Sequence, residues 1–208
     1  MKNLVIIDYG MGNLFSILKA LQYMRIPAKI SYEKKDIKNA CGLILPGVGA
    51  FRDAIKEIHR RKLFNLIKEE VEKGKAILGI CLGFQLLFTK SYEFGINNGF
   101  DFIKGQVIKF KKEKKIPHMG WNTIEIYKKN SKILKGIENN QYFYFVHSFF
   151  ARTAEKEVIL AKTRYEYTEF ISAVEKNRIF GVQFHPEKSG EKALLIYKNF
   201  FKIALGEL

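Results

Sequence analysis

Short apolar runs alternate with helical spacing through residues 4–88, and this alternation restricts the fold more than any other feature of the chain. Four runs have the length of buried strands, namely LVIID (4–8), AKIS (28–31), GLILPG (42–47) and AILGI (76–80). Leu14, Ile17, Leu18 and Leu21 recur at the spacing of one helix face and predict a first helix. Further helical segments are predicted over about 50–72, with a break near 59–62, and from Leu82 to Phe88. Strands separated by helices pair in parallel, so we expect a sheet with helices on both faces.

The second half of the chain contains strand-like runs with short connections and few helix signals. The runs are GQVIKF (105–110), WNTIEI (121–126), YFYFVHSFF (142–150), EVILAKT (157–163), FISAVEK (170–176) and RIFGVQF (178–184). The last two are predicted to form a hairpin that turns at Lys176-Asn177, and a final helix is expected over about 191–203. We therefore predict one α/β domain over 1–208. Its central sheet is expected to be mixed and mostly parallel, with helices on both faces and an antiparallel extension.

The formal net charge of +15 raises the possibility of a nucleic-acid partner. The lysines, however, are spread along the chain in pairs such as those at 34–35, 111–112, 114–115 and 128–129. No zinc-binding spacing, helix-turn-helix signal or aromatic RNA-binding motif accompanies them. The prediction is a protein that binds neither nucleic acid nor metal.

Two further features of the composition concern the compartment. The two cysteines, Cys41 and Cys81, cannot form a disulfide framework and indicate a reducing environment. The apolar run near the N-terminus is five residues long, which is too short for a signal peptide or a membrane span. We expect a cytoplasmic protein that does not associate with membranes.

Cys81 occupies the centre of the sequence Gly79-Ile80-Cys81-Leu82-Gly83, the thiol version of a nucleophile elbow. A sharp turn from strand to helix strains its central residue and brings neighbouring chain close, which favours glycine on either side. The N-terminus of the following helix favours the thiolate. The alternative is a buried structural cysteine. The strand before, the helix after and both glycines together favour the nucleophile.

A nucleophilic cysteine needs a base, and His185 is the best candidate among four histidines. It ends a strand and is followed by Pro186 and Glu187, so a carboxylate two residues away can face the ring and fix its tautomer. If His185 stood alone, it would be interpreted as a histidine at a strand end in a surface turn. Because Cys81 is available as a partner, we favour the role of base. His59 lies on a polar, basic helix face and is expected to be solvated.

The segment LPGVGAF (45–51) leaves a strand end through two glycines. Backbone N–H groups in such a turn can point outward and stabilise an oxyanion on an attacked carbonyl. Seen alone the segment predicts only a turn. Next to a nucleophile elbow it is a candidate oxyanion turn.

GICLGFQ (79–85) and QFHPE (183–187) resemble the motifs of the class I, triad-type, glutamine amidotransferase family. IDYGMGNL (7–14), LPGVGAF (45–51), PHMGWN (117–122), YFVHSF (144–149) and GVQFHPEKSG (181–190) narrow the resemblance to the members that supply ammonia for histidine biosynthesis. The resemblance extends from end to end and implies a flavodoxin-like fold. It implies a glutaminase that needs no cofactor and that passes ammonia to a separate (β/α)₈-barrel cyclase subunit, with which it forms a heterodimer.

The resemblance also implies roles for individual residues. Cys81 would attack the side-chain amide carbon of glutamine, His185 would act as base and then as acid, and Glu187 would orient His185. The remaining implied substrate-binding groups are the oxyanion amides of Gly47, Val48, Gly49 and Leu82, and the amino-acid-binding residues Gln85, His147, Ser148 and Phe149. The implied partner-interface residues are Asn13, Trp121, Asn122 and Tyr144, and plain core packing is the alternative for Trp121.

Two positions depart from the family pattern: Phe84 replaces a residue that is usually methionine, and residues 97–105 replace a Gly-Leu-Gly-Leu run. These departures leave open a paralogous subunit that supplies ammonia to amidinate a surface-polysaccharide sugar. A stand-alone γ-glutamyl hydrolase is a further alternative, but such enzymes lack the combination of Gln85 and the PHMGWN segment. A catalytically inactive protein is disfavoured because Cys81, His185 and Glu187 are all present.

Overall fold

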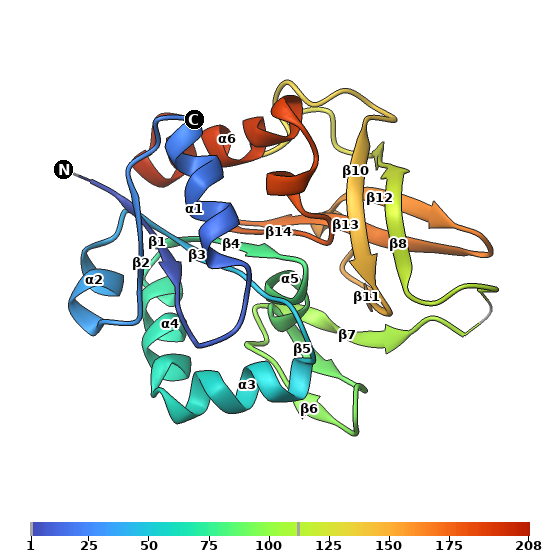
Figure 1. Ribbon diagram of the computed structural model, residues 1–208, viewed down its shortest axis with the longest axis horizontal. Coiled ribbons are helices and arrows are strands. Elements are labelled where there is room, and N and C mark those ends of the chain that lie inside the picture. Colours follow the sequence, from blue (N-terminus) through green and yellow to red (C-terminus); the bar gives the residue numbers. More distant parts are fainter. Residues whose placement is uncertain (1, 112) are drawn as a thin grey trace.

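The computed structural model describes residues 2–111 and 113–208 (Figure 1). The first half contains β1 (Leu4–Ile7), α1 (Leu14–Tyr23), β2 (Ala28–Ser31), α2 (Lys34–Asn39), β3 (Gly42–Leu45), α3 (Phe51–Arg60), α4 (Leu63–Glu72), β4 (Ala76–Ile80), α5 (Leu82–Leu86), β5 (Phe88–Ser91) and β6 (Asn97–Asn98). The second half contains β7 (Ile103–Lys109), β8 (His118–Thr123), β9 (Glu125–Ile126), β10 (Tyr142–His147), β11 (Phe149–Arg152), β12 (Ile159–Tyr165), β13 (Thr168–Lys176), β14 (Ile179–Val182) and α6 (Leu195–Leu205), with short 3₁₀ turns at Lys156–Val158, Pro186–Lys188 and Glu191–Leu194.

The central sheet has eight strands in the order β2-β1-β3-β4-β14-β13-β12-β9. Strands β2, β1, β3, β4 and β14 pair in parallel, and β14, β13, β12 and β9 pair antiparallel. This confirms the mixed sheet with an antiparallel extension, including the hairpin, in which Lys176 pairs with Ile179. The order β2-β1-β3-β4 is that of flavodoxin-like sheets, whose sites lie outside the carboxyl ends of the strands.

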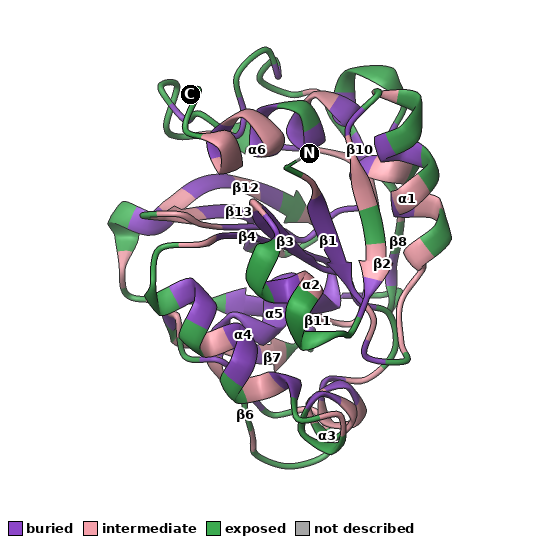
Figure 2. Ribbon diagram, turned by 90° about the vertical axis from the view of Figure 1, so that its left-hand side faces the viewer, coloured by how far each residue is buried: buried purple, intermediate pink, exposed green. Residues whose placement is uncertain are grey.

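The parallel strands are buried on both faces because helices cover each face. Leu4 and Ile6 of β1 belong to the core cluster that contains residues of α1 and α6. Val5 and Ile7 belong to the cluster on the other face, which contains residues of α3 and α4. Figure 2 shows β1 buried along its length, with the exposed residues on the outer sides of the helices. Continuous apolar strands of this kind are typical of parallel sheets.

The helical stretch over 50–72 breaks where the sequence indicated. Helix α3 ends at Arg60 and α4 begins at Leu63, and between them Lys62 adopts a left-handed conformation with φ 58°. The helix expected from Leu82 to Phe88 is shorter than predicted, because it ends at Leu86 and Phe88 begins β5. Phe88 pairs with Ile103 of β7, so sheet pairing overrides the helical spacing there. The six-residue helix α2 was not predicted.

The run at 142–150 is not one strand, as expected, but two strands that belong to different sheets. The chain breaks at Ser148, so that β10 pairs with β8 while β11 pairs with β7. Strands β11, β7, β5 and β6 form a four-stranded sheet, and β10 and β8 form a two-stranded one. In Figure 1 the β8–β10 pair stands beside the end of the central sheet. Part of the predicted antiparallel extension therefore lies outside the central sheet.

Within residues 2–111 and 113–208, no helix has both the length and the apolar character needed to cross a bilayer. In the same part of the chain, no group of three or more His, Cys, Asp or Glu side chains is placed to hold a metal ion.

Candidate active site

The turn that carries Cys81 is strained, and its glycines are required by close packing. Cys81 lies between β4 and α5 with φ 54° and ψ −107°. A Cβ atom on Gly79 would lie 2.6 Å from the carbonyl oxygen of Gly83, and one on Gly83 would lie 1.8 Å from the carbonyl oxygen of Leu45. Neither position can hold a larger residue without moving backbone. The turn therefore places the sulfur at the carboxyl edge of the sheet, at the start of a helix.

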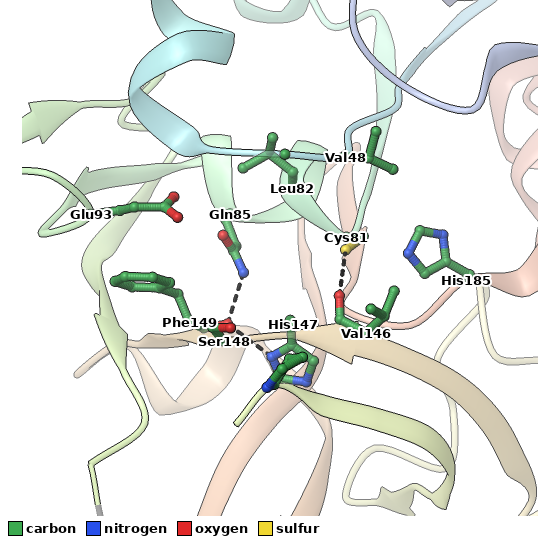
Figure 3. Close-up of a pocket in the computed structure, with 12 residues that line it drawn as sticks. Val48, Cys81, Leu82, Gln85, Glu93, Val146, His147, Ser148, Phe149 and His185 are labelled. Carbon is green, nitrogen blue, oxygen red and sulfur yellow. Dashed lines mark hydrogen bonds between the residues drawn. The ribbon is translucent and has the colours of Figure 1, made fainter. Parts of the chain in front are cut away.

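His185 lies behind the sulfur with a carboxylate on its far side. The residue is 2% exposed, and Nδ1 donates to Glu187 Oε1 at 2.8 Å. The second oxygen of Glu187 accepts from the Tyr197 hydroxyl at 3.0 Å. Among the described residues, His185 Nε2 has no hydrogen-bond partner, and the ring lies next to Cys81 (Figure 3). Nε2 is therefore the nitrogen that can exchange a proton with the thiol.

The surroundings of His185 favour its charged form. Burial alone disfavours the imidazolium, but the negative charges of Cys81 and Glu187 outweigh burial and raise the pKa of His185. Tyr197 remains a neutral donor, because burial and the neighbouring Glu187 carboxylate raise the pKa of its hydroxyl. The arrangement suits a thiolate–imidazolium pair oriented by a carboxylate.

Two groups flank the sulfur from the other side. Cys81 Sγ lies 3.8 Å from the carbonyl oxygen of Val146, and Gln183 Nε2 donates to Sγ at 3.7 Å. Gln183 is fully buried. An N–H aimed at sulfur stabilises a thiolate. We did not predict a role for Gln183, although it begins the QFHPE motif.

A cavity of about 290 Å³ opens in front of Cys81 (Figure 3). The residues lining it that the resemblance implied are Val48, Gly49, Cys81, Leu82, Gln85, His147, Ser148, Phe149 and His185. Glu93, Pro117 and Val146 also line it and were not predicted. Gly47 is not at the cavity surface. A Cβ there would lie 2.6 Å from Leu82 Cβ, so Gly47 instead allows the turn to pack on the elbow.

The side chain of Gln85 is fixed by two donated hydrogen bonds. Its Nε2 donates to the carbonyl oxygen of Phe149 at 2.9 Å and to Gln183 Oε1 at 3.0 Å. A flipped amide would set oxygen against both acceptors, so the hydrogen bonds determine its orientation. Its Oε1 is left as an acceptor at the edge of the cavity.

Glu93 adds a negative charge to the cavity next to Gln85 (Figure 3). Its Oε2 accepts from the backbone N–H of Phe51 at 2.7 Å, at the start of α3. Partial burial raises the pKa of its carboxyl, and the hydrogen bond from Phe51 opposes that rise. Nothing local in the sequence marks Glu93, because it reaches the site through a hydrogen bond between the segment after β5 and the start of α3.

The candidate oxyanion turn contacts the elbow directly. Gly49 has φ +92°, and the buried hydroxyl of Tyr9 donates to the carbonyl oxygen of Pro46 at 2.8 Å. The amide of Leu82 is the first in α5, so it has no acceptor within the helix. The amides of Val48 and Gly49 donate to no other described residue. These amides are therefore without another described acceptor, and their role toward an oxyanion stays a prediction.

A sequence model described as "Glutamine amidotransferase class-I" matches residues 5–204. The chain belongs to this family. Among curated relatives of this amidotransferase, "Imidazole glycerol phosphate synthase subunit HisH" of Caldanaerobacter subterraneus is 52% identical, with 94% of this chain and 95% of the relative covered. The protein of the same name from Aquifex aeolicus is 46% identical, with 94% of each chain covered.

Solved structures share the fold of this amidotransferase at low sequence identity. "Structure of PurLQS from Thermotoga maritima" matches with a TM-score of 0.78 at 19% identity, and 98% of this chain and 99% of that chain are covered. "Trypanosoma brucei CTPS - glutaminase domain with bound acivicin" matches with a TM-score of 0.72 at 17% identity, and covers all of this chain and 95% of that chain. The likeness extends over the whole architecture.

The residues of this amidotransferase expected at a partner interface lie outside the cavity. Trp121 of β8 is 58% exposed, so the alternative of core packing is wrong. It pairs with Tyr144 of β10, and their ring centroids are 6.2 Å apart. Asn122 donates to the carbonyl oxygen of Arg164. Asn13 directly precedes α1, and its side chain makes no capping hydrogen bond there. Asn13 comes from a different element than the other three.

His59 of this amidotransferase is exposed on α3, as expected, and its ring stacks on Phe64 with centroids 4.4 Å apart. It does not line the cavity. Cys41 is half-buried just before β3, and burial raises the pKa of its thiol. Neither residue is placed to take part in the chemistry at Cys81.

Proposed function

We propose that this amidotransferase is the glutaminase subunit of a heterodimer that makes imidazole glycerol phosphate and AICAR in histidine biosynthesis. It hydrolyses glutamine to glutamate and ammonia and passes the ammonia to a (β/α)₈-barrel cyclase subunit. The observation that carries the proposal is the buried His185–Glu187 pair beside Cys81 in a chain 52% identical to a protein named as a subunit of that synthase. A cytoplasmic location agrees with this pathway role.

The chemistry proceeds in two steps through a thioester. The Cys81 thiolate attacks the side-chain amide carbon of glutamine, and the negative charge that develops on oxygen is held by the amides of Leu82, Val48 and Gly49. Imidazolium Nε2 of His185 donates its proton to the leaving nitrogen, the C–N bond breaks and ammonia departs. Water then attacks the thioester carbon while His185 takes its proton, and the C–S bond breaks to release glutamate.

The far end of the cavity suits the amino-acid end of the substrate. Gln85 Oε1 and the Glu93 carboxylate are both acceptors, and Glu93 also carries negative charge, so they match a positively charged α-amino group. The opposite end holds Cys81 and the oxyanion donors. A glutamine side chain laid between the two ends places its amide carbon at the sulfur.

A separate consumer of ammonia is supported by the surface around β8. Met119 and Trp121 alternate along that strand, so they share a face, and they are 56% and 58% exposed. Exposed large apolar side chains grouped in this way are typical of a protein–protein interface. Ammonia released into water becomes protonated and loses its nucleophilicity, so a docked partner that receives it directly preserves its reactivity.

The test separates ammonia supply from ammonia use. We expect Cys81→Ser, assayed with the cyclase subunit, to lose the glutamine-dependent reaction and to keep the reaction supported by added ammonium salt at high pH. The matched control is Cys41→Ser, which should keep both reactions. Loss of both reactions by Cys81→Ser in a folded complex, or retention of the glutamine-dependent one, would contradict the proposal.

A further inference from the structure

Two buried histidines that the proposed chemistry does not use lie one behind the other beside the cavity. His147 and His118 are 6% and 3% exposed, and Nε2 of His147 lies 3.0 Å from Nδ1 of His118. On the cavity side, His147 Nδ1 lies 2.8 Å from the carbonyl oxygen of Phe149. On the outer side, His118 Nε2 lies 3.2 Å from Asn122 Nδ2. Every ring nitrogen of the pair therefore has a partner.

The outer end of this chain of hydrogen bonds has a fixed direction. Asn122 Nδ2 also donates to the carbonyl oxygen of Arg164 at 3.0 Å, and Asn122 Oδ1 accepts from the backbone N–H of Thr123 at 2.8 Å. Exchanging the amide oxygen and nitrogen would place the oxygen against the carbonyl oxygen of Arg164 and the nitrogen against the N–H of Thr123. The nitrogen of Asn122 therefore faces His118 and donates to it.

The inner end of the chain, where His147 meets Phe149, has the same direction of donation, from the outer side toward the cavity. The carbonyl oxygen of Phe149 can only accept, so His147 Nδ1 carries a proton. Aromatic rings enclose the pair, with Phe145 and Tyr165 stacked on His118, and burial lowers the pKa of His118 to about 4 and that of His147 to about 3. Both rings are neutral at pH 7, so His118 Nδ1 donates to His147 Nε2. Each ring holds its single proton on Nδ1.

The carbonyl of Phe149 is the point at which two sets of hydrogen bonds meet. It accepts from His147 Nδ1 and from Gln85 Nε2, so it has no capacity left for a substrate. Gln85 in turn donates to Gln183, which donates to Cys81 Sγ. An unbroken series of hydrogen bonds thus links Asn122 on β8 to the nucleophile.

We infer that His118 and His147, each with its single proton on Nδ1, form a chain of hydrogen bonds that fixes the Phe149 carbonyl and thereby orients Gln85 for glutamine binding. His118 does not line the cavity, so it is a positioning residue that acts through His147 and Phe149. The inference rests on the proposed function, because it takes glutamine as the molecule in the cavity.

The tautomers can be measured without any assay of activity. We expect ¹⁵N NMR of the full chain labelled at histidine to show, at pH 7, a neutral ring with its proton on Nδ1 for both His118 and His147. His118→Phe, His147→Phe and the exposed His59→Phe assign the signals. A proton on Nε2 of either ring, or a positively charged ring at pH 7, would overturn the inference.

Glutamine binding provides the second test, carried out in a Cys81→Ser background so that bound glutamine is not consumed. Adding His118→Phe keeps an aromatic ring but removes both hydrogen bonds of His118. It should raise the Kd for glutamine about tenfold, because the Phe149 carbonyl that accepts from Gln85 is no longer held in place. His118→Asn places an amide nitrogen near the position of Nδ1 and should restore affinity to within about threefold of the background. The control His59→Phe should leave the Kd unchanged.

The two proposals fail in different ways in this experiment. If Cys81→Ser binds no glutamine, the proposed function fails. If it binds glutamine and His118→Phe binds equally well, the positioning chain is refuted while the glutaminase assignment stands. Equal losses in His118→Phe and His118→Asn would show that the ring acts by packing alone and would also refute the chain.

Discussion

Two walls of the cavity each carry a buried histidine, and the two histidines have opposite protonation. On one wall His185 contacts the Glu187 carboxylate, and the negative groups around it raise its pKa. On the other wall burial lowers the pKa of His147 to about 3, because its neighbours are a carbonyl and a neutral ring and no carboxylate opposes the effect of burial. Their exposed fractions, 2% and 6%, are nearly the same. The comparison teaches that burial disfavours the charged form of both rings, and that the negative groups behind an imidazole decide whether it exchanges protons or holds a position.

The largest predicted difference between the walls is in turnover. His185→Ala should reduce glutamine-dependent turnover by at least about 10⁴-fold, because both the proton acceptor and the proton donor of the reaction are removed. His118→Phe should act mainly on glutamine affinity. Steady-state kinetics with the partner subunit measure kcat and KM for each. A comparable fall in kcat for both variants would break the comparison.

The carboxylate behind His185 can be neutralised without changing its shape. Glu187→Gln should lower turnover by about 10²- to 10³-fold, less than a full triad loss in a serine enzyme, because a thiol ionises more readily than a hydroxyl. It should also lower the pKa of His185, since one of the two negative charges that raise it is gone. The pH dependence of kcat/KM reports this. An unchanged rate and an unchanged pH profile would remove Glu187 from the mechanism.

A smaller effect is expected in the stability of the folded chain at mildly acidic pH. His118 and His147 have folded pKa values below the ordinary 6.5, so the unfolded chain binds more protons than the folded one. Their contribution to the free energy of unfolding is complete above about pH 6.5. It is lost as the pH falls toward the folded pKa values, about 4 for His118 and about 3 for His147. His185 has a raised pKa, so its slope has the opposite sign and fades as the pH falls about one unit below 6.5, where both states are protonated.

The His118→Phe variant isolates one of these two contributions. Between pH 6.5 and 5 the free energy of unfolding of the wild type should fall more steeply than that of His118→Phe, by up to about 1.4 kcal/mol per pH unit. Urea unfolding at several pH values measures the slopes, with His59→Phe as the control. Parallel curves for the wild type and His118→Phe would show that His118 binds protons equally in the folded and the unfolded chain, so that folding does not lower its pKa.

The sequence predicted those parts of the site that depend on neighbours in the chain. The elbow around Cys81 and the corner from His185 to Glu187 are short motifs whose geometry is set by glycine, proline and the ends of strands. The parallel strands were equally clear because each is a short apolar run followed by a helix.

The missed features depend on contacts between distant segments. The break at Ser148 was hidden in a continuous apolar run, because only pairing with β8 on one side and β7 on the other separates β10 from β11. Glu93 reaches the cavity through packing, and the link from His118 to His147 needs the register of β8 against β10, which sets the two residues opposite each other. Patterns of neighbouring residues in the sequence carry no information about such contacts between distant segments.

The most direct test of the account is to map where a glutamine-analogue electrophile reacts. A diazo-ketone analogue of glutamine should label Cys81 and spare Cys41, because only Cys81 lies in the cavity at a helix N-terminus, and burial raises the pKa of the Cys41 thiol. Peptide mapping by mass spectrometry after partial reaction gives the site, and excess glutamine should protect it. Modification confined to Cys81 and prevented by glutamine is the predicted result. Equal labelling of both cysteines, or labelling of Cys41 alone, would contradict the assignment of Cys81 as the nucleophile.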